Sequence, residues 1–299
     1  MDVDCLIIGG GPAGLTAATY LGRFRRKVVL VDAGDSRAAW IPVTHNVPGF
    51  SEGVTGPGFL EILRAQADHY GARRISGSVA TLVKSQETFS ASWQGGEARA
   101  AKVLLATGGL DVEPQIPDAK ALVKAGLIRH CPICDAYEAR GQKIALLSYG
   151  KCRIKEALLI RGYTVDLTVL TLGHRTDIAQ GDLSLLQDAG INVVIDPIAR
   201  LSREGGKIAA WPAANGNPLY FDTIYSALGM KLRSELAIGL GADTDEDGAL
   251  LVDRHQHTTV DGLYAAGDIV HGLSQVSVAA GQAAIAATAI NGSLPSLRY

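Results

Sequence analysis

The chain has 299 residues, of which 47% are hydrophobic and 19% charged, and its formal net charge is −2 at neutral pH. This length and composition predict two folded domains with sizeable cores, and they exclude a disordered chain. Basic runs and alternating aromatic and basic residues are both missing, so nucleic acid is not an expected partner. Four cysteines in a chain this long do not make a disulfide framework.

The first predicted strand, Val3 to Ile8, starts almost at the N-terminus, so we expect no charged leader and no cleavage site before it. The longest mildly apolar stretch, Val276 to Ile290, contains Gln282 and predicts an alanine-rich packed helix that is too short and too polar to span a bilayer. These features predict a cytoplasmic protein without membrane contact. In such a compartment, a CxxC pair indicates redox or metal chemistry.

A glycine-rich loop follows the first strand. Gly9, Gly11 and Gly14 stand at the GxGxxG spacing, and 12–23 predicts a helix directly after the turn. In this motif the first glycine allows a tight turn, the second lets the backbone approach a pyrophosphate, and the third lets the helix pack on the strand. The phosphates then meet free N–H groups at the helix N-terminus. The residues predicted to surround the pyrophosphate are Gly9, Gly11, Pro12, Ala13 and Gly14.

An acidic residue follows the next strand. The strand 28–31 ends at Asp32, whose carboxylate is placed to accept the two ribose hydroxyls of an adenosine. A strand before the loop, a helix after it and an acid at this distance together predict a dinucleotide site. The alternative is a glycine turn that serves packing alone.

Two later strands also end in small or acidic residues. The strand 103–106 runs into Thr107 and Gly108, and the strand 262–266 ends in Gly267 and Asp268. In two-dinucleotide flavoproteins, segments of this kind are the ATG and GD motifs, and the acid binds the ribityl chain of FAD. A single NAD-binding fold would not need the second of these segments. Because that segment lies so far along the chain, the FAD-binding domain must be discontinuous.

Together these motifs resemble the low-molecular-weight thioredoxin reductases, over nearly the whole chain. The segment 44–50, which contains Asn46, is similar to that family's flavin-contacting loop, and 131–135, Cys-Pro-Ile-Cys-Asp, is similar to its redox-active CxxCD. Gln275 and Val276 resemble the pair that meets the pyrimidine edge of the flavin and opens the last helix. The resemblance implies FAD as the cofactor.

The resemblance also implies an architecture. The expected fold class is α/β, with two Rossmann-like dinucleotide-binding domains of the three-layer ββα type. The FAD-binding domain would comprise 1–112 and 233–299, and a central domain at 113–232 would carry the CxxC. Two short hinges and a homodimer complete the implied arrangement.

The paired thiols are expected to be redox-active. A CxxC at the start of a helix lowers a thiol pKa, and the thiolate is the reactive species. Half of a zinc site and an inert structural pair are the alternatives, but Cys5 and Cys152 are isolated, so no metal site is expected. By resemblance, Cys134 faces the flavin, Cys131 attacks the partner's disulfide, and Asp135 donates and accepts the proton.

A second strand–loop–helix unit, with its strand at 143–147 and its helix at 154–161, departs from the family. Its turn at 148–153 reads Ser-Tyr-Gly-Lys-Cys-Arg, where the family has Gly-x-Gly-x-x-Ala. Serine restricts φ at the tight turn, tyrosine can fill the pyrophosphate space, and arginine keeps helix and strand apart. After the strand 165–171, the segment 172–177 retains one His-Arg of the basic cluster that grips the 2′-phosphate of NADPH. Both departures predict that NADPH is not used productively.

The predicted function is therefore an FAD-dependent thiol–disulfide oxidoreductase that does not use NADPH directly. Its thiol partner would be a thioredoxin-like protein or a small-molecule dithiol or disulfide, and its electron partner ferredoxin, another carrier or oxygen. Three alternatives stay open: an NADPH-dependent thioredoxin reductase with an atypical loop, an oxygen-using dithiol oxidase, and a flavin-bound redox sensor without turnover.

Residues around the cysteine pair give mixed indications of the direction of electron flow. His130 before the pair, and Tyr137 with Glu138 after it, resemble the flanks found in dithiol oxidases. Asp135 is instead the choice of the reductases. His130 could relay protons or simply pack, and the terminal Tyr299 is either an exposed residue or a cap over the flavin.

Overall fold

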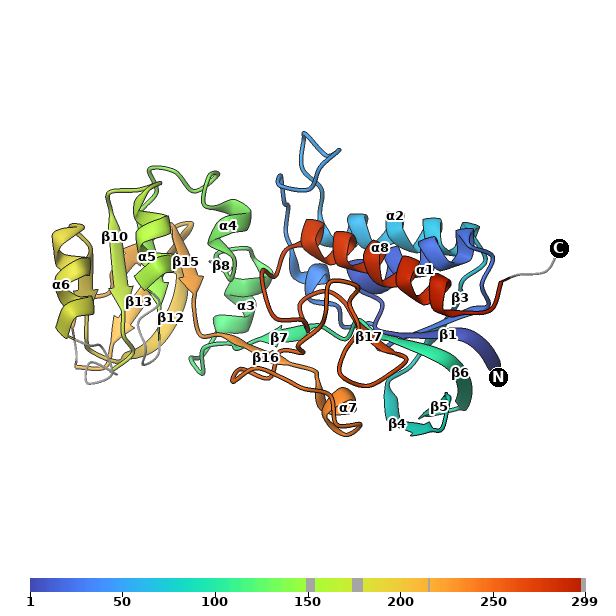
Figure 1. The fold of residues 1–299 in the computed structure, drawn as a ribbon. Coiled ribbons are helices and arrows are strands. Elements are labelled where there is room, and N and C mark those ends of the chain that lie inside the picture. Colours follow the sequence, from blue (N-terminus) through green and yellow to red (C-terminus); the bar gives the residue numbers. More distant parts are fainter. Residues whose placement is uncertain (149–153, 174–179, 215, 297–299) are drawn as a thin grey trace. The chain divides into compact units, whose positions relative to one another are not determined.

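The computed structural model describes residues 1–148, 154–173, 180–214 and 216–296. It contains two compact units (Figure 1). Unit 1 consists of Met1–Val43, Val47–Leu110 and Lys231–Tyr299, and unit 2 of Thr44–Asn46 and Asp111–Met230. The chain enters unit 2 through β7 (Gly109–Asp111) and leaves it through β16 (Met230–Leu232), and these two strands pair with each other. A discontinuous unit 1 follows from this path.

Unit 1 is built on a seven-stranded sheet with the order β3-β2-β1-β6-β5-β4, in which β17 also pairs with β6. Its parallel part contains β1, β2, β3, β6 and β17, while β4 and β5 add an antiparallel ribbon to β6. The strands are β1 (Asp2–Ile8), β2 (Val28–Asp32), β3 (Arg73–Ser76), β4 (Val79–Ser85), β5 (Thr88–Trp93), β6 (Gly96–Leu105) and β17 (Leu263–Ala265). Near-continuous apolar runs in β1 and β2 suit strands that are covered on both faces.

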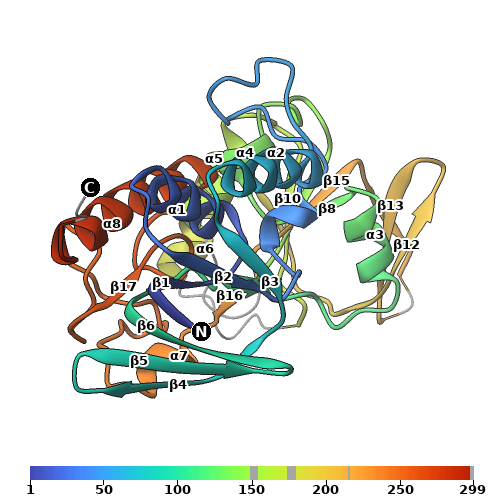
Figure 2. The same cartoon turned by 90° about the vertical axis from the view of Figure 1, so that its right-hand side faces the viewer.

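Three helices cover one face of the parallel part of this sheet, and the antiparallel ribbon with a short helix covers its other face (Figure 2). The first group is α1 (Pro12–Arg23), α2 (Gly56–His69) and α8 (Val276–Ser293); the short helices of unit 1 are α7 (Glu235–Ile238) and the 3-10 helix η1 (Arg37–Trp40). Small buried side chains such as Ala283 and Ala287 allow α8 to pack closely beside α1. This close packing fixes the N-termini of both helices relative to the sheet.

Unit 2 contains a five-stranded parallel sheet with the order β11-β10-β9-β15-β8. Its strands are β8 (Ile128–Arg129), β9 (Ile144–Leu147), β10 (Leu167–Leu170), β11 (Asn192–Val194) and β15 (Thr223–Ser226). Every residue of β9, β10 and β15 is buried, because both faces are covered. The covering elements are α3 (Ala119–Lys124), α5 (Ile154–Arg161), α6 (Gln180–Asp188) and the antiparallel strands β12 (Ile198–Glu204), β13 (Lys207–Pro212) and β14 (Leu219–Phe221).

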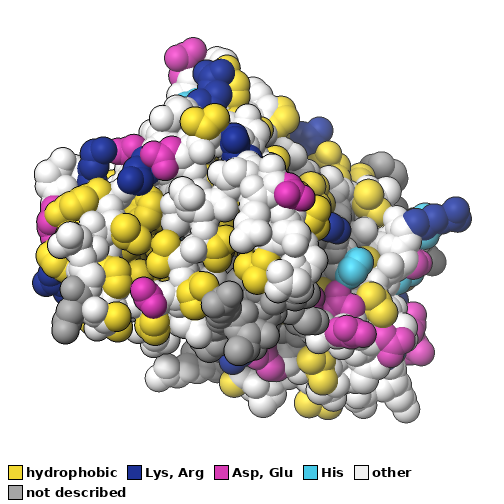
Figure 3. Space-filling model, turned by 90° about the vertical axis from the view of Figure 1, so that its left-hand side faces the viewer, with side chains coloured by type: hydrophobic (Ala, Val, Ile, Leu, Met, Phe, Trp, Pro, Cys, Tyr) yellow, Lys and Arg dark blue, Asp and Glu magenta, His cyan; other side chains and the backbone are white. Residues whose placement is uncertain are grey.

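The α/β class with two Rossmann-like units is confirmed. The predicted helices at 12–23 and 154–161 have the same bounds in the structure, and the alanine-rich helix that starts at Val276 runs three residues past its predicted end, Ile290. No helix in the described part of the chain is long and apolar enough to cross a membrane. Both signs of charge lie among hydrophobic side chains on the face drawn in Figure 3, in keeping with the small net charge.

Candidate functional site

Four parallel strands of unit 1 end at one edge of the sheet. Ile8 of β1 lies beside Val31 of β2 and Leu105 of β6, and Leu105 in turn lies beside Ala265 of β17. At or just beyond these strand ends stand the residues predicted to bind the cofactor: Gly9, Asp32, Thr107, Gly108, Gly267 and Asp268. The carboxyl edge of a parallel sheet is where α/β folds bind nucleotides.

The glycine loop is shaped by close backbone contacts. Gly9 has φ of 112°, and a side chain there would overlap the carbonyl oxygen of Ala106 after β6. A side chain at Gly14 would overlap the carbonyl oxygen of Gly9, so α1 lies directly against the end of β1. Gly11 caps α1 and Pro12 opens it, which leaves the first N–H groups of the helix facing the loop. The loop therefore has the backbone form that a pyrophosphate needs.

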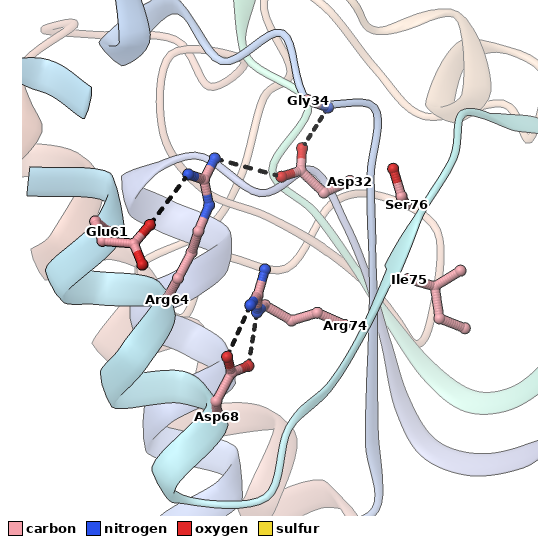
Figure 4. A pocket seen from close by; sticks show the side chains of 8 residues that line it. All are labelled: Asp32, Gly34, Glu61, Arg64, Asp68, Arg74, Ile75 and Ser76. Atoms are coloured by element: carbon pink, nitrogen blue, oxygen red, sulfur yellow. Dashed lines mark hydrogen bonds and ion pairs between the residues drawn. The ribbon is translucent and has the colours of Figure 1, made fainter. Parts of the chain in front are cut away.

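Asp32 lines a cavity of about 560 Å³ (Figure 4). Its Oδ1 accepts a hydrogen bond from the backbone N–H of Gly34 at 2.9 Å, and its Oδ2 lies 4.0 Å from Nη2 of Arg64. The lining residues are Asp32, Gly34, Glu61, Arg64, Asp68, Arg74, Ile75 and Ser76. A cavity of this size, with a carboxylate at the end of the second strand, fits the adenosine half of a dinucleotide.

Two arginines that the sequence motifs did not indicate also line this cavity. Arg74 from β3 donates to both oxygens of Asp68 at 2.6 and 2.7 Å, and this hydrogen bonding lowers the pKa of the Asp68 carboxyl. Arg64 from α2 lies between Asp32 and Glu61, and its Nη1 is 3.9 Å from Oε2 of Glu61. The cavity thus carries both signs of charge. A basic residue at one helical turn before Asp68 is too common a pattern to have identified Arg64 in advance.

Asp268 lies beside the glycine loop. A side chain at Gly267 would come within 3.0 Å of the Cβ of Ala13, so the turn before Asp268 packs against the first turn of α1. The carboxylate of Asp268 pairs with Nη1 of Arg37 at 3.2 Å. Arg37, from η1, is a third arginine that sequence reasoning missed, because no local pattern connects it with a strand end so far along the chain.

The remaining predicted flavin contacts lie on neighbouring segments. The hydroxyl of Thr107 donates to the carbonyl oxygen of Arg233 at 2.7 Å, and the guanidinium of Arg233 pairs with Asp35. Gln275 stands at the N-cap position of α8, and Val276 is the first residue of that helix. Their contacts with FAD stay predictions.

Cys131 and Cys134 form a disulfide in unit 2, with their Cα atoms 5.3 Å apart. The pair follows β8 after His130 and spans the start of α4 (Pro132–Asp135), a helix of a single turn, while the intervening Ile133 is exposed. Among the cysteines that the structure describes, Cys5 lies outside the disulfide; it is fully buried, and burial raises the pKa of its thiol. Thiolate chemistry in the described residues therefore belongs to the disulfide pair.

Asp135 follows the disulfide directly, and its side chain is largely buried. The hydroxyl of Tyr225 donates to Oδ1 at 2.6 Å, and Nη1 of Arg129 lies 3.3 Å from Oδ2. Burial raises the pKa of the Asp135 carboxyl, whereas Tyr225 and Arg129 act in the opposite direction and the charge of Glu138 adds to the rise. A raised carboxyl pKa suits a group that takes up and releases a proton during catalysis.

Histidine–carboxylate pairs flank this segment within unit 2. Nε2 of His130 lies 3.2 Å from a carboxylate oxygen of Glu113, and Nδ1 of His45 lies 3.3 Å from Glu138. The structure groups Asn46 with unit 2, where its Nδ2 donates to the carbonyl oxygen of Ile133 at 3.4 Å. The sequence motif had assigned Asn46 to the flavin, and that contact stays a prediction.

The second loop is described only at its start. Ser148 follows β9 and is buried, and among the residues that the structure describes its Oγ has no hydrogen-bond partner. The departures predicted at Tyr149–Arg153, the basic remnant at 174–175 and the terminal Tyr299 lie outside the described residues.

A dinucleotide-type edge in one unit and a CxxCD disulfide in the other define a flavoprotein disulfide oxidoreductase. Residues 3–283 match the model of the pyridine nucleotide-disulphide oxidoreductase family, and the chain belongs to that family. It is 30% identical to the thioredoxin reductase of Mycolicibacterium smegmatis, over 93% of this chain and 92% of that protein. The thioredoxin reductase of Streptomyces coelicolor is 29% identical, over 95% and 91% of the two chains.

Among solved structures, the crystal structure of HlmI has a TM-score of 0.88 at 29% identity, with 97% of this chain and 92% of that one covered. The resemblance to thioredoxin reductases is thus confirmed, and the chain is an FAD-dependent disulfide oxidoreductase of that type. The residues present fit FAD: the glycine loop leaves no room for side chains at Gly9 and Gly14, and Asp32 lines a cavity beside it.

Proposed function

We propose that this protein exchanges electrons between FAD and a partner disulfide or dithiol through Cys131 and Cys134, without direct use of NADPH. The observation that carries the proposal is the Cys131–Cys134 disulfide with the hydrogen-bonded carboxyl group of Asp135 next to it. FAD, when bound, supplies or accepts the electron pair. The residues at the edge of the unit 1 sheet bind it there, with Asp32 at the ribose and Asp268 at the ribityl chain.

In the reductive direction, the thiolate of Cys131 attacks one sulfur of the partner's disulfide. A mixed disulfide forms, and the partner's other sulfur leaves as a thiolate. Cys134 then attacks the sulfur of Cys131, which releases the second partner thiolate and re-forms the Cys131–Cys134 bond. The two protons that the enzyme thiols lose end on the partner's two sulfurs, and Asp135 carries the proton of Cys134. Oxidation of a dithiol is the same sequence in reverse.

The proposal that NADPH is not used rests on the second loop. A serine with a buried side chain stands at the end of β9, at the place that Gly9 takes after β1. The sequence then continues with Tyr149 and with Arg153 at the position of closest helix–strand approach, and one His-Arg remains at 174–175. These residue types do not match what a pyrophosphate and a 2′-phosphate require.

The test is anaerobic mixing of the FAD-loaded protein with excess NADPH. We expect the flavin absorption band to persist, and rapid full bleaching would refute the NADPH part of the proposal. Excess dithiothreitol is the matched control, because it should bleach the band through the cysteine pair. The same control should fail in Cys134→Ser, which separates reduction through the disulfide from direct reduction of the flavin.

A second candidate is an NADPH-dependent thioredoxin reductase with an atypical loop. The description of the family, pyridine nucleotide-disulphide oxidoreductase, favours it, and the relatives are named thioredoxin reductases. Those names also support a thioredoxin-like protein as the thiol partner, with a small-molecule dithiol or disulfide as the alternative. In the first proposal, where NADPH is not used, the electron partner is ferredoxin, another carrier or oxygen. Turnover with each pair under anaerobic and aerobic conditions separates these options, and turnover with none of them would indicate a redox sensor.

The expected homodimer and cytoplasmic location are part of the same proposal. Sedimentation of the FAD-loaded protein should give twice the chain mass of 31.3 kDa. Fractionation of cells should recover the protein with cytoplasmic markers. Sedimentation as a monomer would contradict the expected homodimer, and recovery outside the cytoplasm would contradict the expected location. Neither result would bear on the proposed disulfide chemistry.

A further inference from the structure

Two neighbouring strands of unit 2 bring their side chains to one carboxyl group. Tyr225 of β15 and Arg129 of β8 are direct partners in the parallel register of the sheet. Both side chains reach Asp135. This residue ends the short helix α4, which follows β8 in the chain (Figure 1). Neither residue belongs to a motif in the sequence, and the proposed reaction assigns no role to either.

The hydroxyl of Tyr225 is held by the core. Tyr225 is fully buried, and its ring belongs to the hydrophobic cluster that also contains Leu146 of β9 and Ile160 of α5. Because every residue of β15 is buried, the ring cannot turn away without opening this core. Its hydroxyl donates to Oδ1 of Asp135 at 2.6 Å, a length typical of a strong hydrogen bond to a carboxylate.

Arg129 binds the same residue from the neighbouring strand. Its Nη1 lies 3.3 Å from Oδ2 of Asp135 and donates to the Asp135 carbonyl oxygen at 3.4 Å. Its Nε donates to the carbonyl oxygen of Gly126 at 3.3 Å, which anchors the guanidinium. The two carboxyl oxygens of Asp135 therefore have different partners, a neutral hydroxyl on one and a cation on the other.

These partners decide how readily the carboxyl group ionises. Burial favours its protonated form, and the negative charge of Glu138 acts in the same direction. The Tyr225 hydroxyl and the Arg129 cation favour the ionised form. When either donor is removed, one of the two interactions that lower the pKa of Asp135 is lost, while burial and Glu138 still raise it. The protonated form of Asp135 should therefore persist to higher pH. A freed carboxyl group could also rotate away from the cysteine pair.

We propose that Tyr225 and Arg129 are positioning residues that hold the Asp135 carboxyl group and set the pH at which it exchanges a proton with the cysteine pair. The inference rests on the proposed function, in which Asp135 is the acid–base group of the disulfide exchange. It goes further by naming the residues that fix the geometry and the ionisation of that group.

The direct test is a titration of Asp135 in Tyr225→Phe. Protein in the disulfide form, labelled with ¹³C at aspartate carboxyl groups, is titrated by NMR, and the Asp135 signal is identified by its loss in Asp135→Asn. We expect the midpoint to move to higher pH by about 1 in Tyr225→Phe and in Arg129→Gln, the usual scale for loss of a donor or a nearby charge. Arg129→Lys keeps the cation and should restore most of the difference.

Tyr220→Phe is the matched control in the same unit. Tyr220 is more exposed, and its hydroxyl donates to Glu204 at 3.0 Å, so its loss should leave the Asp135 midpoint unchanged. An unchanged or lowered midpoint in both Tyr225→Phe and Arg129→Gln would overturn the inference. A move of equal size in Tyr220→Phe would also overturn it, because the effect would then not depend on contact with Asp135.

A kinetic readout connects the titration with the reaction. Protein reduced with a dithiol, then freed of the reductant, is mixed with the aromatic disulfide 5,5′-dithiobis(2-nitrobenzoic acid) over a range of pH. The acid limb of the rate profile should move to higher pH in Tyr225→Phe, and the same substitution in Asp135→Asn should add no further move. If the NMR midpoint of Asp135 moves in Tyr225→Phe but the acid limb of the rate profile does not, the link between Asp135 ionisation and proton exchange is refuted. Failure of the proposed function is distinct, since Cys131→Ser would then react as fast as the parent.

Discussion

The two units place different chemistry on the same arrangement of strands. In unit 1 the parallel strands run in the order β3-β2-β1-β6-β17, and in unit 2 they run β11-β10-β9-β15-β8. In each unit the central strand, β1 or β9, is followed in the chain by a helix. The strand that completes the parallel order comes late in the sequence of unit 1 (β17) and early in the sequence of unit 2 (β8). The difference between the units therefore lies in the residues that follow the strands.

The strand ends show this difference position by position. After the central strand, unit 1 has Gly9 with φ of 112°, whereas unit 2 has the buried Ser148. After the outer strand β17 comes Asp268, and after its counterpart β8 come His130 and Cys131. The carboxyl edges of these two equivalent sheets thus carry the predicted flavin-binding acid Asp268 in unit 1 and the Cys131–Cys134 disulfide in unit 2. The scaffold thus fixes where chemistry occurs, and the loop residues decide which chemistry it is.

The largest expected effect comes from the edge of unit 2. Cys131→Ser should lower dithiol–disulfide turnover on the order of a thousandfold or more, because the serine hydroxyl is not a comparable nucleophile at neutral pH. FAD content, measured from the flavin absorption, should stay at the level of the parent. Cys5→Ala is the control, since that thiol is buried in unit 1 and should be dispensable for turnover. Full turnover in Cys131→Ser would show that the disulfide is structural.

Asp135→Asn should lower turnover on the order of a hundredfold, the scale of a lost acid–base group.

The same substitution should raise the stability of the folded protein relative to the parent as the pH rises. Because the folded-state pKa of Asp135 lies above its ordinary value, the stabilisation from its proton is present at acid pH and is lost as pH rises through the folded pKa. Asparagine removes this loss. The thermal midpoint of Asp135→Asn should therefore gain on the parent between acid and neutral pH, and a steady decline relative to the parent would contradict the burial argument.

The local parts of this architecture could be predicted from the sequence, whereas the contacts between distant segments could not. Helix 12–23 and its glycine loop could be predicted because one short segment contains the strand, the turn and the helix start. The contacts of Asp135 with Tyr225 and of Asp268 with Arg37 could not, because each joins residues from distant segments that come together only through the packing of the sheet. Thr44–Asn46 shows the same limit, since its grouping with unit 2 has no local signal.

The next largest effect is expected on FAD binding at the carboxyl edge of the unit 1 sheet. Asp32→Ala should weaken FAD binding by the apoprotein about 10- to 100-fold, the scale of lost hydrogen bonds to a charged group. Titration of FAD fluorescence measures it. Glu61→Ala is the matched control, because this carboxylate lines the same cavity but is mostly exposed and stands on α2. Thr171→Ala, at the equivalent strand end of unit 2, should also leave FAD binding unchanged. An equal loss in the two controls would remove the distinction between the sheet edges.

The smallest effect tests whether the two units differ in stability as well as in chemistry. The hydroxyl of Thr55 caps α2 by accepting a hydrogen bond from the N–H of Gly58 at 3.2 Å. Thr55→Ala should destabilise unit 1 by about 1 kcal/mol. Thr288→Ala is the control, because its hydroxyl only bonds back to the Ala284 carbonyl within α8, and its loss should cost little.

Tryptophan positions allow the units to be followed separately in urea. Trp93 lies in unit 1 and Trp211 in unit 2, so variants that retain one of them, with the other tryptophans changed to phenylalanine, report on one unit each. Thr55→Ala should lower the midpoint seen by Trp93 and leave that seen by Trp211 in place. Equal shifts at both probes would mean that the units unfold as one cooperative body, and the contrast between them would then be one of chemistry alone.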